Sequence, residues 1–268
     1  MRFYFNFCLL SILFFSSLLN AQSSLTLEDW KEYKFRNIGP AGMSGRITAI
    51  EVDPFDDSRI FLGAASGGLW LSENGGISFK PIFDDQSNLS IGSIKINPRN
   101  SSHIWVGTGE GNPRNSLNTG NGIYKSLDGG QTWKCMGLEN TKVIHRIIIN
   151  KDNPDIVYVA AMGSPWGPTE ERGVYKTMDG GVTWKRILFV NALTGASDMV
   201  VDPANPDKLI ASMWEHERKP WFFNSGGEGS GLYITYNGGD TWEKIEAKDG
   251  IPKGKLGRIG LAIAASKP

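Results

Sequence analysis

The sequence predicts an all-β protein, a β-propeller of four-stranded antiparallel blades. An octapeptide of the form Ser/Thr-x-Asp/Asn-Gly-Gly-x-x-Trp/Phe occurs four times, with its Asp or Asn at Asn74, Asp128, Asp179 and Asn237. These positions are 54, 51 and 58 residues apart, a spacing typical of propeller blades. The chain also holds 33 glycines and 9 tryptophans in 268 residues, and each repeat is centred on a tight turn. A solenoid of helices is therefore excluded.

Each repeat carries four strand-like segments in the same order. The first strands are apolar, run into an Asp- or Asn-containing turn, and are expected at 47–52, 91–96, 144–149 and 199–201. The second strands are expected at 60–62, 104–106, 157–159 and 209–211. The third strands are centred on an aromatic residue in every repeat, at 68–71, 122–125, 173–176 and 231–234. They lead into the octapeptide, whose aromatic residue begins the fourth strand. Four alternating strands between Gly and Pro punctuation make one blade.

This frame divides the chain. We expect blades at about 44–86, 87–140, 141–193 and 194–256, after a lead-in segment at 22–43. Residues 257–263 repeat the pattern of a first strand, so 257–268 are expected to begin an incomplete fifth blade of a longer propeller. The alternative is that this last strand closes a small ring.

The four octapeptides, called anchor turns here, are predicted to lock the connection between the third and fourth strands. A side-chain oxygen accepts N–H bonds from its own turn, and glycine takes the positive φ that the turn requires. Asn keeps the acceptor oxygen of Asp but cannot act as an acid or bind a metal as an anion, so the mixture of Asp and Asn favours a structural role. The residues expected to build the anchor turns are Ser72, Asn74, Gly76 and Phe79, Ser126, Asp128, Gly130 and Trp133, Thr177, Asp179, Gly181 and Trp184, and Thr235, Asn237, Gly239 and Trp242.

The anchor turns resemble the Asp-box, or BNR repeat, of sialidases, xyloglucanase-type glycosidases and the sortilin propeller. Residues 35–46 also resemble the start of large secreted bacterial BNR-repeat proteins described as glycosyl-hydrolase-like or sortilin-like. The resemblance implies a propeller fold with either a binding or a glycosidase function. In xyloglucanase-type relatives an Arg-Thr-Asp-Val-Gly-Gly segment after the second strand of the first blade carries a catalytic Asp. This chain has Ala65 at that place, which counts against that activity.

The N-terminal segment, the cysteines and the net charge indicate where the protein acts and which partners it lacks. Residues 1–21 hold one early cation, an apolar run and a small residue before Gln22, which predicts a secretory signal peptide and an exported protein with no membrane insertion after cleavage. One cysteine, Cys135, remains after that cleavage, so no intramolecular disulfide is expected. The 28 basic residues balance 28 acidic ones, which gives no footprint for nucleic acid. No cofactor or metal site is predicted.

The connections between second and third strands differ most among the repeats. They span 63–68 in the first repeat but 107–122, 160–173 and 212–231 in the others. In a meander these connections emerge at the end opposite the anchor turns, so we expect a ligand-binding surface there, with a polar channel wall from the first strands beside it. The candidate ligand-binding residues are Glu110, Arg114, Asn115, Trp166, Glu171, Arg172, Trp214, Glu215, Arg218, Trp221, Arg146 and Asp198. Trp, Arg and carboxylates suit glycan stacking or peptide capture. The alternative for each tryptophan is burial in a small core under its loop, and His216 is expected at the surface.

Three functional classes remain open from the residues. A binding module for a carbohydrate, peptide or protein ligand is favoured. A glycoside hydrolase would need a pair of carboxyl groups at a defined separation, and no residue is singled out as catalytic by a motif. A structural scaffold of the cell envelope is the third class.

Overall fold

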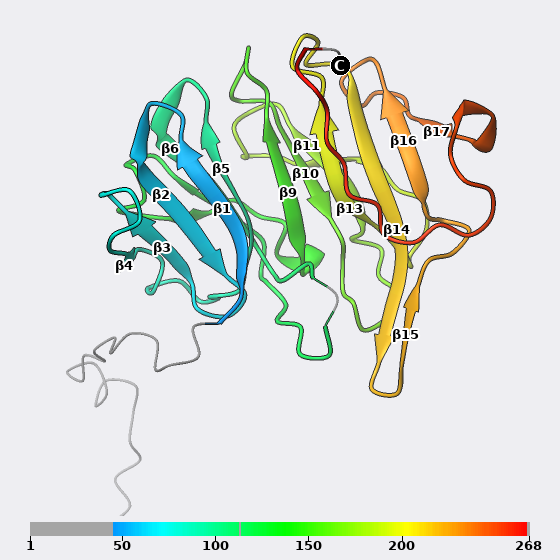
Figure 1. Ribbon diagram of the computed structural model, residues 1–268, viewed down its shortest axis with the longest axis horizontal. Coiled ribbons are helices and arrows are strands. Elements are labelled where there is room, and N and C mark those ends of the chain that lie inside the picture. Colours follow the sequence, from blue (N-terminus) through cyan, green and yellow to red (C-terminus); the bar gives the residue numbers. More distant parts are fainter. Residues whose placement is uncertain (1–44, 113, 267–268) are drawn as a thin grey trace, which may run out of the picture. The chain divides into compact units, whose positions relative to one another are not determined.

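The computed structural model describes residues 45–112 and 114–266, which belong to one compact unit, Gly45–Pro268. Four antiparallel sheets follow each other along the chain (Figure 1). The first sheet is β1 (Ile47–Asp53), β2 (Asp56–Ala64), β3 (Leu69–Ser72) and β4 (Lys80–Pro81). The second is β5 (Ile91–Asn97), β6 (Asn100–Thr108), β7 (Ile123–Ser126) and β8 (Lys134–Cys135). The third is β9 (Ile144–Ile149), β10 (Val157–Ala161), β11 (Gly173–Thr177) and β12 (Lys185–Leu188). The fourth is β13 (Thr194–Val201), β14 (Leu209–Lys219), β16 (Gly231–Thr235) and β17 (Glu243–Ile245), with β15 (Phe222–Ser225) paired to β14.

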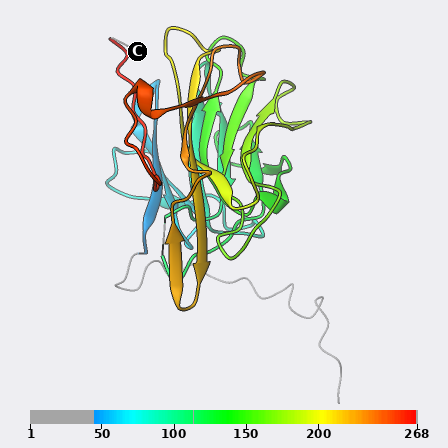
Figure 2. The ribbon, with the colours of Figure 1, turned by 90° about the vertical axis from the view of Figure 1, so that its right-hand side faces the viewer.

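In the first three sheets the strands form a meander, each strand hydrogen-bonded to the one before it in sequence, and in the fourth sheet β16 pairs with β14. The predicted all-β fold of four-stranded blades is therefore confirmed. Among the described residues the helical content is two 3₁₀ turns, η1 (Glu139–Thr141) and η2 (Ala247–Asp249). The fourth blade differs from the prediction, because β14 continues through residues 212–219 and returns as β15. What the sequence indicated as a long loop is largely a two-stranded hairpin, which projects past the other strands (Figure 2).

The apolar core lies between neighbouring blades. Phe61 and Leu69 of the first blade pack with Ile94 and Val106 of the second. Equivalent clusters join the second blade to the third and the third to the fourth. The first strands of consecutive blades are in contact along the chain, β1 with β5, β5 with β9 and β9 with β13. Since each blade buries its faces against its neighbours, its position depends on the blades beside it.

The anchor turns contain internal hydrogen bonds from backbone N–H groups to side-chain oxygens. In the second blade, Asp128 Oδ1 accepts from the backbone N–H of Thr132 at 2.9 Å, and Gly130 N donates to Ser126 Oγ at 2.8 Å. The two glycines of this turn have φ of 75° and 95°, which side chains rarely adopt. In addition, Gly129 N donates to the carbonyl of Ser102 at 2.9 Å. This bond ties the turn to the start of the second strand of its own blade, and each of the four blades has an equivalent bond at the start of that strand or just before it.

The Asp and Asn anchors use their second side-chain atom in opposite directions. Thr132 Oγ1 donates to Asp128 Oδ2 at 2.5 Å, whereas Asn74 Nδ2 donates to Ser78 Oγ at 2.8 Å. A hydroxyl can serve as donor or acceptor, so both anchors are satisfied. The hydrogen-bond geometry is compatible with the structural role predicted for the alternation.

The aromatic residue of an anchor turn contacts the preceding blade, not only its own. Trp133 Nε1 donates to the carbonyl of Ile82 at 2.8 Å, and its ring meets Phe83 edge to face at 5.1 Å. Trp184 Nε1 donates to the carbonyl of Met136 at 2.7 Å. These two residues therefore join consecutive blades.

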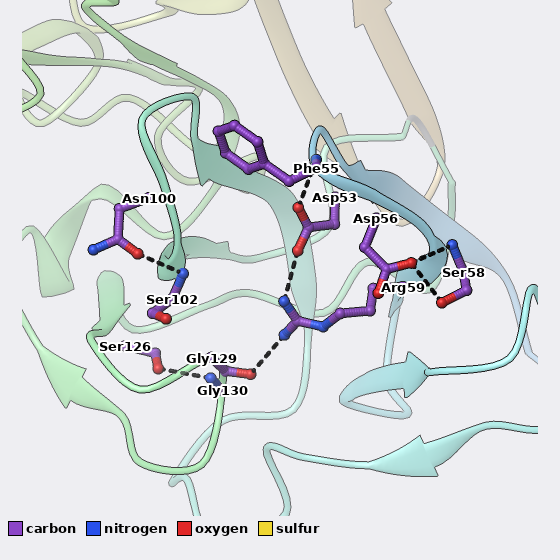
Figure 3. Close-up of polar contacts among 10 residues, drawn as sticks. All are labelled: Asp53, Phe55, Asp56, Ser58, Arg59, Asn100, Ser102, Ser126, Gly129 and Gly130. Atoms are coloured by element: carbon purple, nitrogen blue, oxygen red, sulfur yellow. Dashed lines mark hydrogen bonds and ion pairs between the residues drawn. The ribbon is translucent and has the colours of Figure 1, made fainter.

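A cation adds a second tie between consecutive blades. Arg59 of the first blade reaches the carbonyl of Gly129 in the second blade's turn at 3.4 Å, and it pairs with Asp53 at 2.6 Å (Figure 3). Lys125 reaches the carbonyl of Gly180 at 3.1 Å, and Lys176 that of Gly238 at 2.8 Å. Each of these cations also lies over an aromatic ring of its own blade, Phe61, Trp105 and Tyr158 respectively.

Residues 257–266 are not paired as a strand of a sheet. The segment enters through a bridge between Leu256 and Gly227. Leu261 N then donates to Asp198 Oδ2 at 3.0 Å, and Arg258 donates to His145 at 2.7 Å. The segment therefore lies against the first strands of the third and fourth blades, and its assignment to a fifth blade stays a prediction.

No helix of the described residues is long and apolar enough to cross a membrane. The predicted signal peptide at 1–21 and the lead-in segment lie outside the described residues, so export also stays a prediction.

Candidate ligand-binding site

Two exposed tryptophans lie on the connections between second and third strands, at the end of the blades opposite the anchor turns. Trp166 of the third blade is 41% exposed and Trp221, at the tip of the β14–β15 hairpin, is 79% exposed. Phe222 beside it is 43% exposed. The hairpin is tied to the loop of the third blade, because Arg218 N donates to the carbonyl of Pro165 at 2.7 Å. Exposed aromatic rings from two adjacent blades are thus carried by segments that are hydrogen-bonded to each other.

Arg172 holds this arrangement from below and is not itself available to a ligand. Its side chain is fully buried. It donates to the carbonyls of Ser164, Gly167 and Leu193 at 2.6 to 3.1 Å, and to Nδ1 of His216 at 3.1 Å. Burial lowers the pKa of Arg172 to about 10, which leaves it charged at neutral pH. Arg172, predicted from the sequence to bind a ligand, instead holds its own loop together by donating to backbone carbonyls.

Trp214 takes the other alternative, burial in a small core. It is 1% exposed, stacks on His216 with ring centroids 4.2 Å apart, and meets Phe223 edge to face. His216 is also buried, contrary to the expectation of a surface position. Burial, with the nearby charge of Arg172, lowers the pKa of His216 to about 3, so the imidazole is neutral. These two rings support the base of the hairpin.

Glu110 is a buried carboxylate with a dedicated partner. It is 1% exposed and accepts from Arg46 at two atoms, Oε1 at 2.8 Å and Oε2 at 2.5 Å. This bidentate pair joins the residue before β1 to the loop of the second blade. Arg114 and Asn115, farther along the same loop, are exposed.

The remaining loop candidates are partly buried and engaged locally. Glu171 accepts a hydrogen bond from Thr169, and Glu215 accepts one from Gly229 N at 3.0 Å. The guanidinium of Arg218 lies over the ring of Phe223 at 4.0 Å. The structure therefore separates the predicted set into exposed residues at the tips and residues that hold the loops. A sequence signal for this division is the strand-like alternation from Trp214 to Arg218, which places every second side chain inward.

The first strands line a cavity of about 470 Å³. Its wall includes Arg146 of β9, and Arg146 Nε donates to Asp198 Oδ1 of β13 at 2.8 Å. Burial alone would raise the pKa of Asp198, but the hydrogen bonds from Arg146 and from Leu261 N hold it below its ordinary value. Arg146 and Asp198, both expected from the sequence beside the channel wall, are thus in direct contact. Ser93, at the equivalent place on β5, is buried and donates to the carbonyl of Ile144 at 3.0 Å.

Comparisons with known proteins agree with this architecture. The family model described as "Sortilin, neurotensin receptor 3," matches residues 121–250. A crystal structure of a GH74 enzyme from Niastella koreensis superimposes with a TM-score of 0.56 and 27% identity, covering 74% of this chain and 29% of that one. The chain is a β-propeller protein. Xyloglucanase Xgh74A of Acetivibrio thermocellus is 26% identical in an alignment of 262 residues that covers 85% of this chain and 28% of the relative. The photosystem II assembly lipoprotein Ycf48 of a Picosynechococcus species is 28% identical in an alignment of 157 residues that covers 48% of this chain and 45% of that protein.

This propeller chain spans less than a third of the length of its xyloglucanase relative. At the place where the resemblance implies a catalytic Asp, Ala65 is 1% exposed and its N–H donates to the carbonyl of Arg46 at 2.9 Å. No carboxyl group is supplied by that position.

Proposed function

We propose that the propeller is a carbohydrate-binding module that holds a glycan chain at the loop end of its third and fourth blades. The observation that carries the proposal is the exposure of Trp166, Trp221 and Phe222 on two loops that are hydrogen-bonded together. Trp214, another large aromatic residue at this end, is buried. The xyloglucanase relatives act on a polysaccharide by name, which favours a glycan over other ligands.

The physical basis is stacking on a prepared surface. The apolar face of a sugar ring packs against an aromatic ring, and such a ring contact contributes about 0.5–1.5 kcal/mol beyond the area that it buries. A rigid support reduces the entropy lost on binding. Here Arg172, Trp214 and Phe223 supply that support from below.

The test is binding of xyloglucan oligosaccharides, with a panel of other neutral polysaccharides beside them. Replacing Trp166 and Trp221 together by alanine should weaken binding about tenfold or more. The matched control is Tyr236→Ala, which removes another aromatic ring of the fourth blade, 60% exposed but at the anchor-turn end. Unchanged affinity in a folded double variant, or an equal loss in the control, would refute the proposal.

A glycoside hydrolase is the second candidate, favoured by the likeness to the xyloglucanases. It predicts new reducing ends when xyloglucan is incubated with the protein. Binding without release supports the module, and release that survives the Trp166 and Trp221 substitutions supports the hydrolase.

A further inference from the structure

The cavity between the first strands holds a group of charges that the stacking surface does not use. Arg146 stands in the wall of this cavity, and its side chain is 46% exposed. Among the described residues its guanidinium makes one hydrogen bond, from Nε to Asp198. The two terminal nitrogens of its guanidinium have no further hydrogen bond among those residues. A planar pair of donors therefore faces the cavity.

Asp198 accepts three hydrogen bonds and fixes the orientation of this fork. Its Oδ1 accepts from Arg146 Nε and from Met199 N, both at 2.8 Å, and its Oδ2 accepts from Leu261 N at 3.0 Å. A carboxylate with three donors is not free to follow the arginine elsewhere. The guanidinium is held in one place with its outer edge presented, as in a prepared binding site.

The charge around the fork is positive by one unit. Arg258 donates to His145 Nε2 at 2.7 Å and lies over the ring of Trp214 at 5.6 Å. Because Nε2 accepts this bond, the proton of a neutral His145 is on Nδ1, which is buried with no partner among the described residues. Burial, with the charges of Arg258 and Arg146, lowers the pKa of His145 to about 4. Among the described residues here, the two positive charges of Arg146 and Arg258 are thus balanced by one negative charge, that of Asp198.

The rest of the cavity wall is neutral. Lys95 pairs with Glu51 at 2.6 Å, and the other lining residues include Ile147, Met199 and Leu261. One net positive charge suits a monoanion, whereas a dianion would leave charge uncompensated beside Asp198. The fork of an arginine matches the two oxygens of a carboxylate. A cavity of about 470 Å³ is within the range of small-ligand sites.

We propose that this cavity binds the carboxylate of an acidic sugar, a uronic acid residue, through the terminal nitrogens of Arg146. The choice of a sugar acid rests on the proposed carbohydrate-binding function. The neutral stretches of the same glycan would then lie on the exposed tryptophans.

The experiment compares two disaccharides that differ in one group, cellobiuronic acid and cellobiose, by calorimetric titration of the whole chain. We expect the acidic sugar to bind about tenfold more tightly or better. Arg146→Gln should abolish this preference, and Arg146→Lys, which keeps the charge without the fork, should retain only part of it. Circular dichroism and melting curves establish that each variant is folded.

The matched control is Lys95→Gln, which also removes one positive charge from the cavity wall. It should change the affinity for the acidic sugar by less than about threefold, because Lys95 is engaged by Glu51. Equal losses in both variants would mean that general charge attracts the ligand, and would overturn the proposal. Equal binding of the two sugars by the unmodified protein would overturn it as well.

Two further arms separate this inference from the proposed function. A short peptide with a free C-terminal carboxylate, compared with its amidated form, tests the other source of a carboxylate, and preferential binding of that peptide would refute the sugar assignment. Neutral xyloglucan oligosaccharides should bind Arg146→Gln as they bind the unmodified protein. If they bind and depend on Trp221 while the acidic preference is absent, the further inference fails and the proposed function stands.

Discussion

The two ends of the blades use similar residues for different purposes. At the anchor-turn end, Trp133 and Trp184 sit against the preceding blade and donate to its carbonyls, and short turns repeat the same bonds in every blade. At the loop end, Trp166 and Trp221 point to solvent on segments of unequal length. The turns that are the same in every blade are therefore at the end that holds the blades together, whereas the loops that differ among blades are at the end that is free to acquire a ligand.

The largest loss of stability is expected from Trp184→Ala, at the anchor-turn end. The substitution removes a ring that meets Trp105 edge to face at 6.1 Å and a hydrogen bond to the preceding blade. We expect the free energy of unfolding to fall by about 3 kcal/mol, measured by denaturant titration. Trp221→Ala, at the other end, is the control and should change it by less than about 0.5 kcal/mol. Comparable losses in both variants would erase the distinction between the ends.

A smaller loss is expected from Gly181→Ala. This glycine has φ of 97°, and a Cβ there would lie 2.5 Å from the ring of Trp105 in the preceding blade. We expect strain and displacement of that ring to cost about 1–3 kcal/mol. Gly75→Ala is the matched control, since its φ is 68° but no atom lies within 4 Å of the added carbon. If the two variants melt alike, backbone strain alone matters and the close contact between blades does not.

The anchors themselves should show a dependence on pH. Hydrogen bonds from Thr132, first from its hydroxyl and then from its N–H, lower the pKa of Asp128 from 3.8 to about 2. The unfolded chain therefore binds the proton first, so the stabilisation is present above about pH 4 and is lost as the pH falls toward about 2. Asp128→Asn should melt close to the unmodified protein at neutral pH and lose less stability on acidification. Asp128→Ala should melt lower at both pH values, and equal melting of the Asn and Ala variants at neutral pH would show that the charge is required.

The smallest effect on stability is expected from a substitution at the loop end. Trp166→Ala should leave the melting temperature nearly unchanged, because 41% of the residue is exposed and its ring makes no aromatic contact among the described residues. Differential scanning calorimetry checks this. A drop as large as that of Trp184→Ala would mean that Trp166 belongs to a core, and would remove it from the proposed glycan surface.

The fold could be predicted from the sequence because its signals are local. Alternating strands, glycine turns and the Asp or Asn anchors each act within about ten residues, and the strands are found where the pattern placed them. The surroundings of the loop residues could not be predicted in the same way. The buried Arg172 donates to the carbonyls of Ser164 and Leu193, which belong to two different connections. The buried Glu110 accepts from Arg46, 64 positions away. Which polar side chain turns inward depends on partners that a single repeat does not contain.

The tie between consecutive blades has a consequence for how such a chain can change in length. The second and third blades each carry a lysine over one of their own aromatic rings and, in their anchor turns, a carbonyl that accepts the cation of the blade before. In the fourth blade Ile234 occupies the position of this lysine. In the first blade Leu71 occupies the place of Lys125 and Lys176, and Arg59 from the neighbouring strand supplies the cation instead. A duplicated copy of the second or third blade would thus bring both the cation and the accepting carbonyl to its new junctions.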